Sequence, residues 1–345
     1  MSTTMKAVSF PGNKAVEIRE VPIPAPGPRE VLIQMKASAI CRSDMSLYYG
    51  NKGVVGQGNT GAVYPGHEPA GQIVQTGEGV ERFKPGDRVA VYLAVGCGEC
   101  QFCKSGYKMF CKEWKCIGFD RHGGDADYIA VPEDNCMRIP DGMSYVTAAV
   151  STDAVGTLYH AQKRLAVSGR DTIVIFGLGP MGGAGVMVAK GLGATVIAVD
   201  MLDERLEIAK ELGADYTINA KENVLERLLE ITGGRGVDAG IDCSGNPVAQ
   251  NTILDSLRPH GRAAFIGEGK EVTIKPSEQL IRKQITVMGS WYFPIFEYDE
   301  IAKFIQDKRL PVEKLVSHTF KIEEAETAFR MFDERKTEKA VFVWE

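Results

Sequence analysis

The chain divides into two regions that differ in how apolar and polar residues alternate. Over the first 150 residues, short alternating runs such as Val31–Ile33 and Arg88–Val91 are separated by segments rich in proline and glycine, such as Pro22–Pro28. Short runs bounded by turn residues are typical of β-strands. We therefore expect this region to be mainly β and to form a partly open barrel.

From about residue 170, apolar strands alternate with helices. The strand-like Thr172–Phe176 precedes a helix from Pro180, and Thr195–Val199 precedes a helix from Asp203. This alternation predicts parallel strands joined by right-handed crossovers, which is an α/β doubly wound sheet. Further strands are expected at Val237–Asp242, Arg262–Gly267 and Ile285–Gly289.

The 345 residues exceed the size at which one hydrophobic core stops growing, so two domains are expected. The tail from Asp299 contains a helix rich in acidic and apolar residues and ends in the strand-like Ala340–Trp344. We expect this tail to return to the first domain. The predicted domains are therefore residues 1–154 with 293–345, and residues 155–292.

Composition excludes several classes of partner. Hydrophobic residues make up 44% of the chain, charged residues 25%, and the formal net charge is −5. No basic cluster suggests binding to nucleic acid or to an anionic membrane, so the expected partner is a small molecule. The N-terminus has no secretion signal and no apolar run approaches the roughly 18 residues of a membrane helix, so we expect a cytoplasmic protein.

The sequence contains four closely spaced cysteines, Cys97, Cys100, Cys103 and Cys111. The spacing C-x2-C-x2-C-x7-C allows four thiolates to surround one tetrahedral zinc ion, and an all-thiolate site of this kind is structural. We expect a structural-zinc lobe at residues 95–113. The remaining Cys116, Cys136 and Cys243 are interpreted as buried free thiols.

A glycine motif follows the strand Thr172–Phe176. Gly177, Gly179 and Gly182, with Pro180 and Met181 between them, match G-x-G-x-x-G between a strand and a helix, the context that a dinucleotide-binding (Rossmann) motif requires. Asp200 ends the next strand, where a carboxylate can bind both hydroxyls of an adenosine ribose. The sequence therefore predicts NAD as cofactor.

A second set of metal-ligand types comprises Cys41, His67, Glu68 and Asp153. Thiolate, imidazole and carboxylate are the ligands of an open catalytic zinc, which leaves one position for a substrate oxygen. Together with the four-cysteine motif and the glycine motif, this set predicts a zinc- and NAD-dependent dehydrogenase.

The whole chain resembles the zinc-containing medium-chain alcohol dehydrogenases, a family that includes alcohol, sorbitol and threonine dehydrogenases. Gly66-His67-Glu68 through Gly77 matches the family pattern G-H-E-x-x-G-x-x-x-x-x-G, and the four-cysteine lobe and glycine motif fall where the family places them. The resemblance implies a GroES-like catalytic domain, a Rossmann domain, and one catalytic and one structural zinc per chain. It also implies a homodimer or a homotetramer.

The resemblance also assigns roles to single residues. Cys41 and His67 would bind the catalytic zinc with Asp153 as third ligand, and Glu68 is the competing candidate for that position. Ser43 would accept the alcohol proton and Arg42 would pair with the cofactor pyrophosphate. Thr157 would touch the nicotinamide unless it only packs its helix, and Arg205 either reaches the adenosine ribose or is solvated.

The sequence departs from the family pattern at two places. Many relatives carry a relay histidine where this chain has Ser46, so water or another base would complete proton release. Sorbitol dehydrogenases carry an Arg-Tyr pair where this chain reads Gly289-Ser290, which weakens a polyol assignment. The candidate pocket walls are Leu47, Phe119 and Trp291.

The predicted function is reversible hydride transfer from a secondary alcohol, cyclic, sugar-like or polyol in kind, to NAD, giving a ketone. Two alternatives remain. A zinc-free quinone or enoyl reductase shares the fold but has no use for these ligands, and a non-enzymatic protein could bind zinc and dinucleotide for structure or sensing.

Overall fold

The computed structural model describes residues 3–51 and 63–345, and the chain divides into two compact units. The first unit contains Met1–Asp153, Pro294–Lys303 and Val316–Glu345. The second contains Ala154–Phe293 and Phe304–Leu315. Within the described ranges, no helix is both long enough and apolar enough to cross a membrane.

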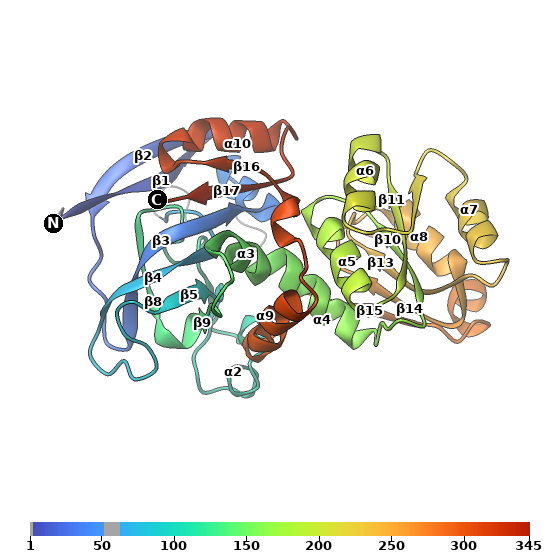
Figure 1. Ribbon diagram of the computed structural model, residues 1–345, viewed down its shortest axis with the longest axis horizontal. Helices are drawn as coiled ribbons and strands as arrows, with labels where there is room; N and C mark the ends of the chain where they lie inside the picture. Colours follow the sequence, from blue (N-terminus) through green and yellow to red (C-terminus); the bar gives the residue numbers. More distant parts are fainter. Residues whose placement is uncertain (1–2, 52–62) are drawn as a thin grey trace. The chain divides into compact units, whose positions relative to one another are not determined.

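Seven strands of the first unit form one sheet (Figure 1). Their order is β16-β17-β3-β4-β5-β9, and β8 also pairs with β3. The pair β16 and β17 is parallel and the other pairs are antiparallel. The strands are β3 (Glu30–Ile40), β4 (Glu68–Thr76), β5 (Arg88–Val91), β8 (Tyr128–Pro132), β9 (Cys136–Arg138), β16 (Val316–Phe320) and β17 (Lys339–Val343).

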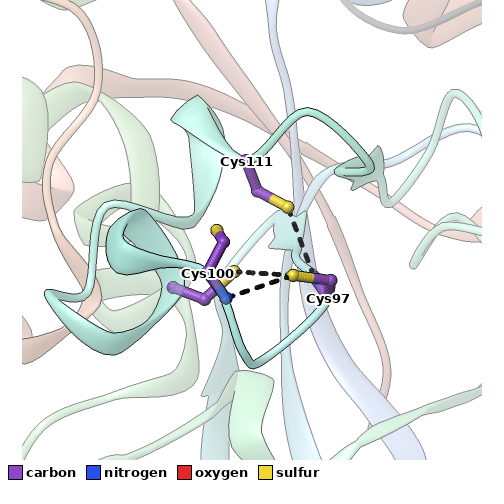
Figure 2. Close-up of side chains that lie close together, drawn as sticks. Cys97, Cys100 and Cys111 are labelled. Carbon is purple, nitrogen blue, oxygen red and sulfur yellow. Dashed lines mark hydrogen bonds between the residues drawn. The ribbon is translucent and has the colours of Figure 1, made fainter.

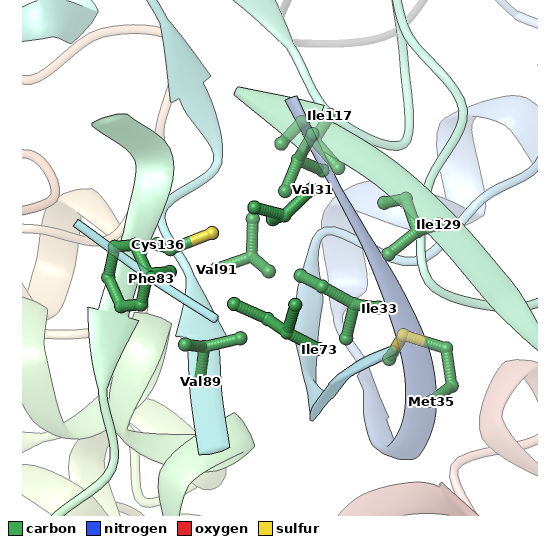
Figure 3. Close-up of a cluster of buried hydrophobic side chains, with 11 residues drawn as sticks. Val31, Ile33, Met35, Ile73, Phe83, Val89, Val91, Ile117, Ile129 and Cys136 are labelled. Atoms are coloured by element: carbon green, nitrogen blue, oxygen red, sulfur yellow. The ribbon is translucent and has the colours of Figure 1, made fainter. Parts of the chain in front are cut away.

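One face of this sheet carries a hydrophobic core cluster of the first unit (Figure 3). Val31, Ile33 and Met35 alternate along β3, so their side chains point to the same face. They pack with Ile73 of β4 and with the remaining core residues, Phe83, Val89, Val91, Ile117, Ile129, Val131 and Cys136. The alternating apolar runs of the sequence therefore form the interior of a mainly β unit, as predicted.

The second unit contains a six-stranded parallel sheet in the order β12-β11-β10-β13-β14-β15 (Figure 1). The strands are β10 (Thr172–Phe176), β11 (Thr195–Asp200), β12 (Tyr216–Asn219), β13 (Val237–Asp242), β14 (Leu257–Phe265) and β15 (Thr286–Gly289). Strand order reverses between β10 and β13, which is the switch point where doubly wound sheets bind ligands. The predicted α/β Rossmann architecture is confirmed.

Two further strand pairs lie outside the large sheets, β1 (Thr4–Gly12) with β2 (Ala15–Pro22) and β6 (Ala94–Val95) with β7 (Lys115–Cys116). The helices are α1 (Met45–Tyr48), α2 (Gln101–Lys104), α3 (Tyr145–Val150), α4 (Gly156–Arg164), α5 (Pro180–Gly191), α6 (Asp203–Glu211), α7 (Val224–Ile231), α8 (Pro247–Ser256), α9 (Tyr298–Asp307) and α10 (Ala325–Asp333).

The tail departs from its predicted assignment. The sequence prediction placed all of residues 293–345 in the first domain, but Phe304–Leu315 belongs to the second unit. The ring of Phe304 lies 5.0 Å from that of Tyr159, and Leu315 packs against Gly183 of α5. Apolar side chains at the end of α9 and after it therefore join the α/β unit before the chain returns to β16.

Candidate functional site

Strand register brings the catalytic candidates to one end of the large sheet of the first unit. Cys41 directly follows β3, and Glu68 begins β4 opposite Ala39 of β3. Lys339 begins β17, one residue before Ala340, which pairs with Ile40 of β3. Three neighbouring strands thus place a thiol, a carboxylate and an ammonium group side by side.

The predicted ligands of the catalytic metal lie together. One donor atom each from Cys41, His67, Glu68 and Asp153 can be chosen so that all lie within 4.8 Å of one another. Cys41 Sγ is 3.3 Å from Asp153 Oδ2, and His67 Nε2 is 3.9 Å from Glu68 Oε1. Residues separated by up to 112 positions in sequence therefore converge on a volume that one ion could occupy.

Asp153 reaches this cluster from a widened helical turn. Residues Ser151–Val155 form a π-helical segment between α3 and α4. Such segments are rare and occur frequently at functional sites, because the inserted residue redirects a side chain. The local backbone therefore presents Asp153 towards Cys41.

Asp44 orients His67, a role that was not predicted from the sequence. His67 Nδ1 lies 2.8 Å from Asp44 Oδ1, and the other Asp44 oxygen accepts a hydrogen bond from the Cys41 amide at 2.8 Å. A carboxylate on Nδ1 fixes the imidazole so that Nε2 faces the other donors, an arrangement typical of histidines that bind metals. The position of Asp44 three residues after Cys41, in the first turn after β3, is the local signal for it.

Lys339 is the second contributor that was not predicted from the sequence. It is 2% exposed, Glu68 is fully buried, and the Lys339 ammonium donates a hydrogen bond to Glu68 Oε1. The other oxygen, Glu68 Oε2, is buried without a hydrogen-bond partner among the described residues. The only hint in the sequence is a lysine at the start of the apolar strand Ala340–Val343.

The charges of this cluster fit a bound divalent cation. Burial raises the pKa of Cys41, and burial also raises the pKa of Glu68 against the opposing effect of Lys339. Three acidic groups, the buried Glu68 and the half-buried Cys41 and Asp153, carry three negative charges when ionised, and Lys339 offsets only one of them. A dication would offset the other two. The donor set is therefore suited to zinc.

The four predicted structural ligands also lie together, in one lobe of the first unit (Figure 2). One sulfur each from Cys97, Cys100, Cys103 and Cys111 lies within 4.8 Å of the others. The amide of Cys100 donates to Cys97 Sγ, and the amide of Cys97 donates to Cys111 Sγ, each at 3.4 Å. These contacts hold the sulfurs towards a common point.

The pKa values of two of these thiols differ in a way that is consistent with a metal-binding site. The backbone amides of Cys100 and Glu99 lower the pKa of Cys97 to about 7, whereas burial raises the pKa of Cys103 to about 12. A thiol as weakly acidic as Cys103 ionises near neutral pH only beside a cation. Four sulfurs without other ligand types fit a closed structural zinc site.

The glycine motif adopts the conformation that its sequence predicts. Gly177 has φ +82°, and a Cβ at Gly182 would lie 1.9 Å from the carbonyl oxygen of Gly177. Gly179 caps α5, and Pro180 occupies the first turn of that helix. The turn therefore leaves the N-terminus of α5 open to a phosphate group, as dinucleotide-binding turns do.

Asp200 lies at the carboxyl end of β11 and contacts this turn. Its carboxylate accepts hydrogen bonds from the amides of Leu178 at 2.7 Å and Leu202 at 3.0 Å. Arg205 Nη1 is 3.9 Å from Asp200 Oδ2, and the Arg205 guanidinium is also close to Gly179. The predicted ribose-binding residues Asp200 and Arg205 thus lie together.

The other candidate residues are distributed over both units. Ser43 is half-buried with its hydroxyl 3.4 Å from His67 Nε2, and Ser46 donates to the Ser43 carbonyl. The Phe119 ring lies 5.5 Å from the His67 ring. The remaining candidates are Leu47 and Thr157, which are buried, Met181, which is half-buried, and Arg42 and Trp291, which are exposed.

The chain matches two family models. Residues 27–141 match the alcohol dehydrogenase GroES-like domain, and residues 180–307 match the zinc-binding dehydrogenase model. An uncharacterised zinc-type alcohol dehydrogenase-like protein of Escherichia coli is 39% identical, with 98% of each chain covered. An L-threonine 3-dehydrogenase of Pyrococcus horikoshii is 34% identical over 99% of each chain, and a sorbitol dehydrogenase of Halalkalibacterium halodurans is 32% identical over 95% of each.

Solved structures agree in fold over the whole length. A dehydrogenase of Escherichia coli crystallised with NADH has a TM-score of 0.89 and 27% identity, covering 99% of this chain and 100% of its own. A zinc-binding dehydrogenase of Sinorhizobium meliloti crystallised with NADP has a TM-score of 0.89 and 25% identity, with the same coverage. The two neighbours therefore carry different forms of the dinucleotide.

Proposed function

The chain belongs to the zinc-containing medium-chain alcohol dehydrogenases, and on that premise we propose that it oxidises a secondary alcohol to a ketone, reversibly, with NAD as hydride acceptor. The coarser activity, a zinc-dependent alcohol oxidoreductase, is that of the family. The observation that carries the proposal is the set of Cys41, His67, Glu68 and Asp153, whose donor atoms lie within 4.8 Å of one another.

Each residue of this set has a chemical role in the proposal. Cys41, His67 and Asp153 would hold the catalytic zinc, which when bound supplies a Lewis acid for the substrate oxygen. Asp44 keeps His67 in the required orientation. The Ser43 hydroxyl, 3.4 Å from His67 Nε2, is placed to take the alcohol proton. Ser46 donates its hydroxyl hydrogen to the Ser43 carbonyl and is no proton buffer, so water would complete the relay.

NAD rather than NADP is proposed because of Asp200. Its carboxylate lies at the end of β11, 8% exposed, where it can bind ribose hydroxyls and would repel a 2′-phosphate. Arg205, 3.9 Å away, partly offsets this repulsion. We propose that Asp200, which the amides of Leu178 and Leu202 hold in place, dominates the choice.

A secondary alcohol is proposed as the substrate class. Threonine at its third carbon and sorbitol at its inner carbons, the substrates named for two relatives, both present secondary hydroxyl groups. The ring of Phe119 beside His67 supplies an apolar wall. Gly289 and Ser290 stand where sorbitol dehydrogenases carry an Arg-Tyr pair, which favours a less polar alcohol than an open-chain polyol.

The test is reduction of NAD by the zinc-loaded protein across secondary alcohols, polyols, cyclitols and amino alcohols. We expect turnover with at least one secondary alcohol, and a kcat/KM with NAD at least about tenfold above that with NADP, which corresponds to about 1.4 kcal/mol. A preference for NADP would contradict the role of Asp200. No turnover across the panel by fully zinc-loaded protein would favour the non-enzymatic alternative, and turnover of a quinone without zinc would favour the zinc-free reductase.

A further inference from the structure

The buried ion pair between Lys339 and Glu68 lies against the proposed catalytic zinc ligands. Lys339 begins β17 and Glu68 begins β4. The strands β17 and β4 pair with opposite edges of β3, which ends directly before Cys41. The exposed fractions of Lys339 and Glu68 are 2% and 0%. Bulk water cannot hydrate either charge, so each charge must be balanced by a neighbouring charge of opposite sign.

When a metal ion is bound, the Glu68 carboxylate has two cations near it, the metal ion and the Lys339 ammonium group. Glu68 Oε1 accepts a hydrogen bond from Lys339 and also lies 3.9 Å from His67 Nε2, whereas Oε2 is buried without a hydrogen-bond partner among the described residues. A Glu68 oxygen also falls within the 4.8 Å cluster formed with Cys41, His67 and Asp153. The same carboxylate can therefore pair with the ammonium group or bind the metal.

The charge balance favours the Lys339 ammonium group over the metal as the partner of the Glu68 carboxylate. A dication with the thiolate of Cys41, the carboxylate of Asp153 and a neutral His67 has no net charge, and Glu68 with Lys339 has none either. Without Lys339, the buried Glu68 carboxylate would be uncompensated, and the dication would be the nearest partner. Four protein ligands would then close the site, as in structural zinc sites, and would leave no position for a substrate.

We infer that Lys339 is a positioning residue that holds Glu68 away from the metal and so keeps the fourth coordination position open. This inference rests on the proposed catalytic zinc. It also assigns the resting third ligand, because a Glu68 carboxylate held by Lys339 leaves Asp153 with Cys41 and His67. The flexible stem and compact charge of a lysine allow this contact to form and break without moving the strand.

Imidazole binding to the cobalt-substituted protein tests the inference independently of turnover. Imidazole is a small neutral donor that can occupy an open metal position, and its binding changes the visible absorption of Co²⁺. We expect Lys339→Met to weaken imidazole binding by at least about tenfold, because Glu68 then fills the position, while it retains the metal more tightly against a chelator. Glu68→Gln/Lys339→Met should restore imidazole binding to the level of the unmodified protein.

The matched control is Lys283→Met. Lys283 is a half-buried lysine of the second unit whose ammonium donates to the carbonyls of Leu254 and Asp255. This variant should bind imidazole as the unmodified protein does. If Lys339→Met does not fold, Lys339→Arg replaces it, and a guanidinium that engages Glu68 should leave imidazole binding undiminished.

The outcomes separate this inference from the proposed function. The role of Lys339 would be overturned if Lys339→Met bound imidazole as the unmodified protein does, or if only the NAD affinity of this variant changed. Weakened imidazole binding in Lys339→Arg would overturn it as well. If the unmodified protein takes up only one Co²⁺ per chain and its spectrum ignores imidazole, the catalytic metal site itself is refuted.

Discussion

Asp238 is a buried carboxylate whose charge is stabilised by hydrogen bonds from three residues of the second unit. Arg235 Nη1 lies 2.8 Å and Arg258 Nε 2.5 Å from its Oδ1, and the amide of Thr172 donates to Oδ2 at 2.8 Å. Burial acts to raise the pKa of Asp238, but these hydrogen bonds outweigh it and the pKa lies below its ordinary value. The folded state therefore favours the ionised carboxylate.

This lowered pKa predicts how stability depends on pH. The stabilisation is fully present above the unfolded pKa, about 3.9, and is lost as the pH falls through the folded pKa. We expect Asp238→Asn to lower the free energy of unfolding by about 2 kcal/mol near pH 7 and by progressively less below about pH 4. Thermal unfolding at several pH values measures this.

The control for Asp238→Asn is an exposed carboxylate. Asp134 lies 3.4 Å from Arg82, with 57% of its side chain exposed. Since exposed ion pairs contribute little, Asp134→Asn should change stability by less than about 1 kcal/mol at any pH. Equal effects of the two substitutions, or a deficit in Asp238→Asn that grows on acidification, would contradict the assigned role of Asp238.

At the residue scale, the sequence predicted donors but not the groups that control them. The four lobe cysteines stand in a local motif, so their chemistry could be inferred from spacing, whereas Cys41 and His67 were assigned from their ligand types and the resemblance to the family. Lys339 lies 271 positions from Glu68, and their contact depends on the pairing of β17 and β4 with opposite edges of β3. No local pattern carries that register, so Lys339 could not have been paired with Glu68 from the sequence.

At the element scale, the four-cysteine lobe has little regular structure of its own. Its segments are the two-residue strands β6 and β7, the four-residue helix α2 and a short 3-10 turn at Lys108–Phe110. Segments this short provide few hydrogen bonds and a small core. Metal binding is therefore expected to supply much of the stability of the lobe.

Cys100→Ser tests this dependence on metal. We expect zinc content to fall from about two ions per chain to about one, and the lobe amides to exchange hydrogen at least about tenfold faster, because three sulfurs bind the ion less tightly. Amides of the parallel sheet should keep their protection. The half-buried Cys243, outside both ligand sets, provides the control Cys243→Ser, which should retain both ions. Unchanged zinc content in Cys100→Ser would refute the structural site.

Elements were predictable where apolar runs and turn residues coincide. Thr172–Phe176 and Val237–Asp242 form strands with the predicted bounds. The first is an almost continuous apolar run, and in the second Val237, Ala239 and Ile241 alternate with Asp238, Gly240 and Asp242. The assignment of Phe304–Leu315 was wrong at the sequence level for a physical reason. Its apolar side chains could pack on either unit, and only the contacts of Phe304 with Tyr159 and of Leu315 with Gly183 determine which.

At the scale of the whole molecule, the edge strand β15 indicates how two chains would associate. β15 ends the six-stranded sheet, and its residues, Thr286 to Gly289, include no charge and no proline. Natural edge strands are usually protected by charge, proline or covering segments, because their unpaired backbone groups bind other strands. Ile281, 67% exposed, precedes this strand and adds apolar surface. We therefore expect two copies to pair antiparallel along β15.

Light scattering measures this association as particle mass. A homodimer or homotetramer has two or four times the 37.6 kDa of the chain. Thr286→Lys should lower the mass at least twofold, because each chain then carries an ammonium group on the edge along which the strands would pair, and a charge on an edge strand opposes pairing with another strand. Tyr216→Lys adds the same charge to β12, the opposite edge strand, at a residue 47% exposed, and should leave the mass unchanged. A mass near 37.6 kDa for the unmodified protein would exclude pairing through β15, and a loss of mass in Tyr216→Lys alone would place the interface at the other edge.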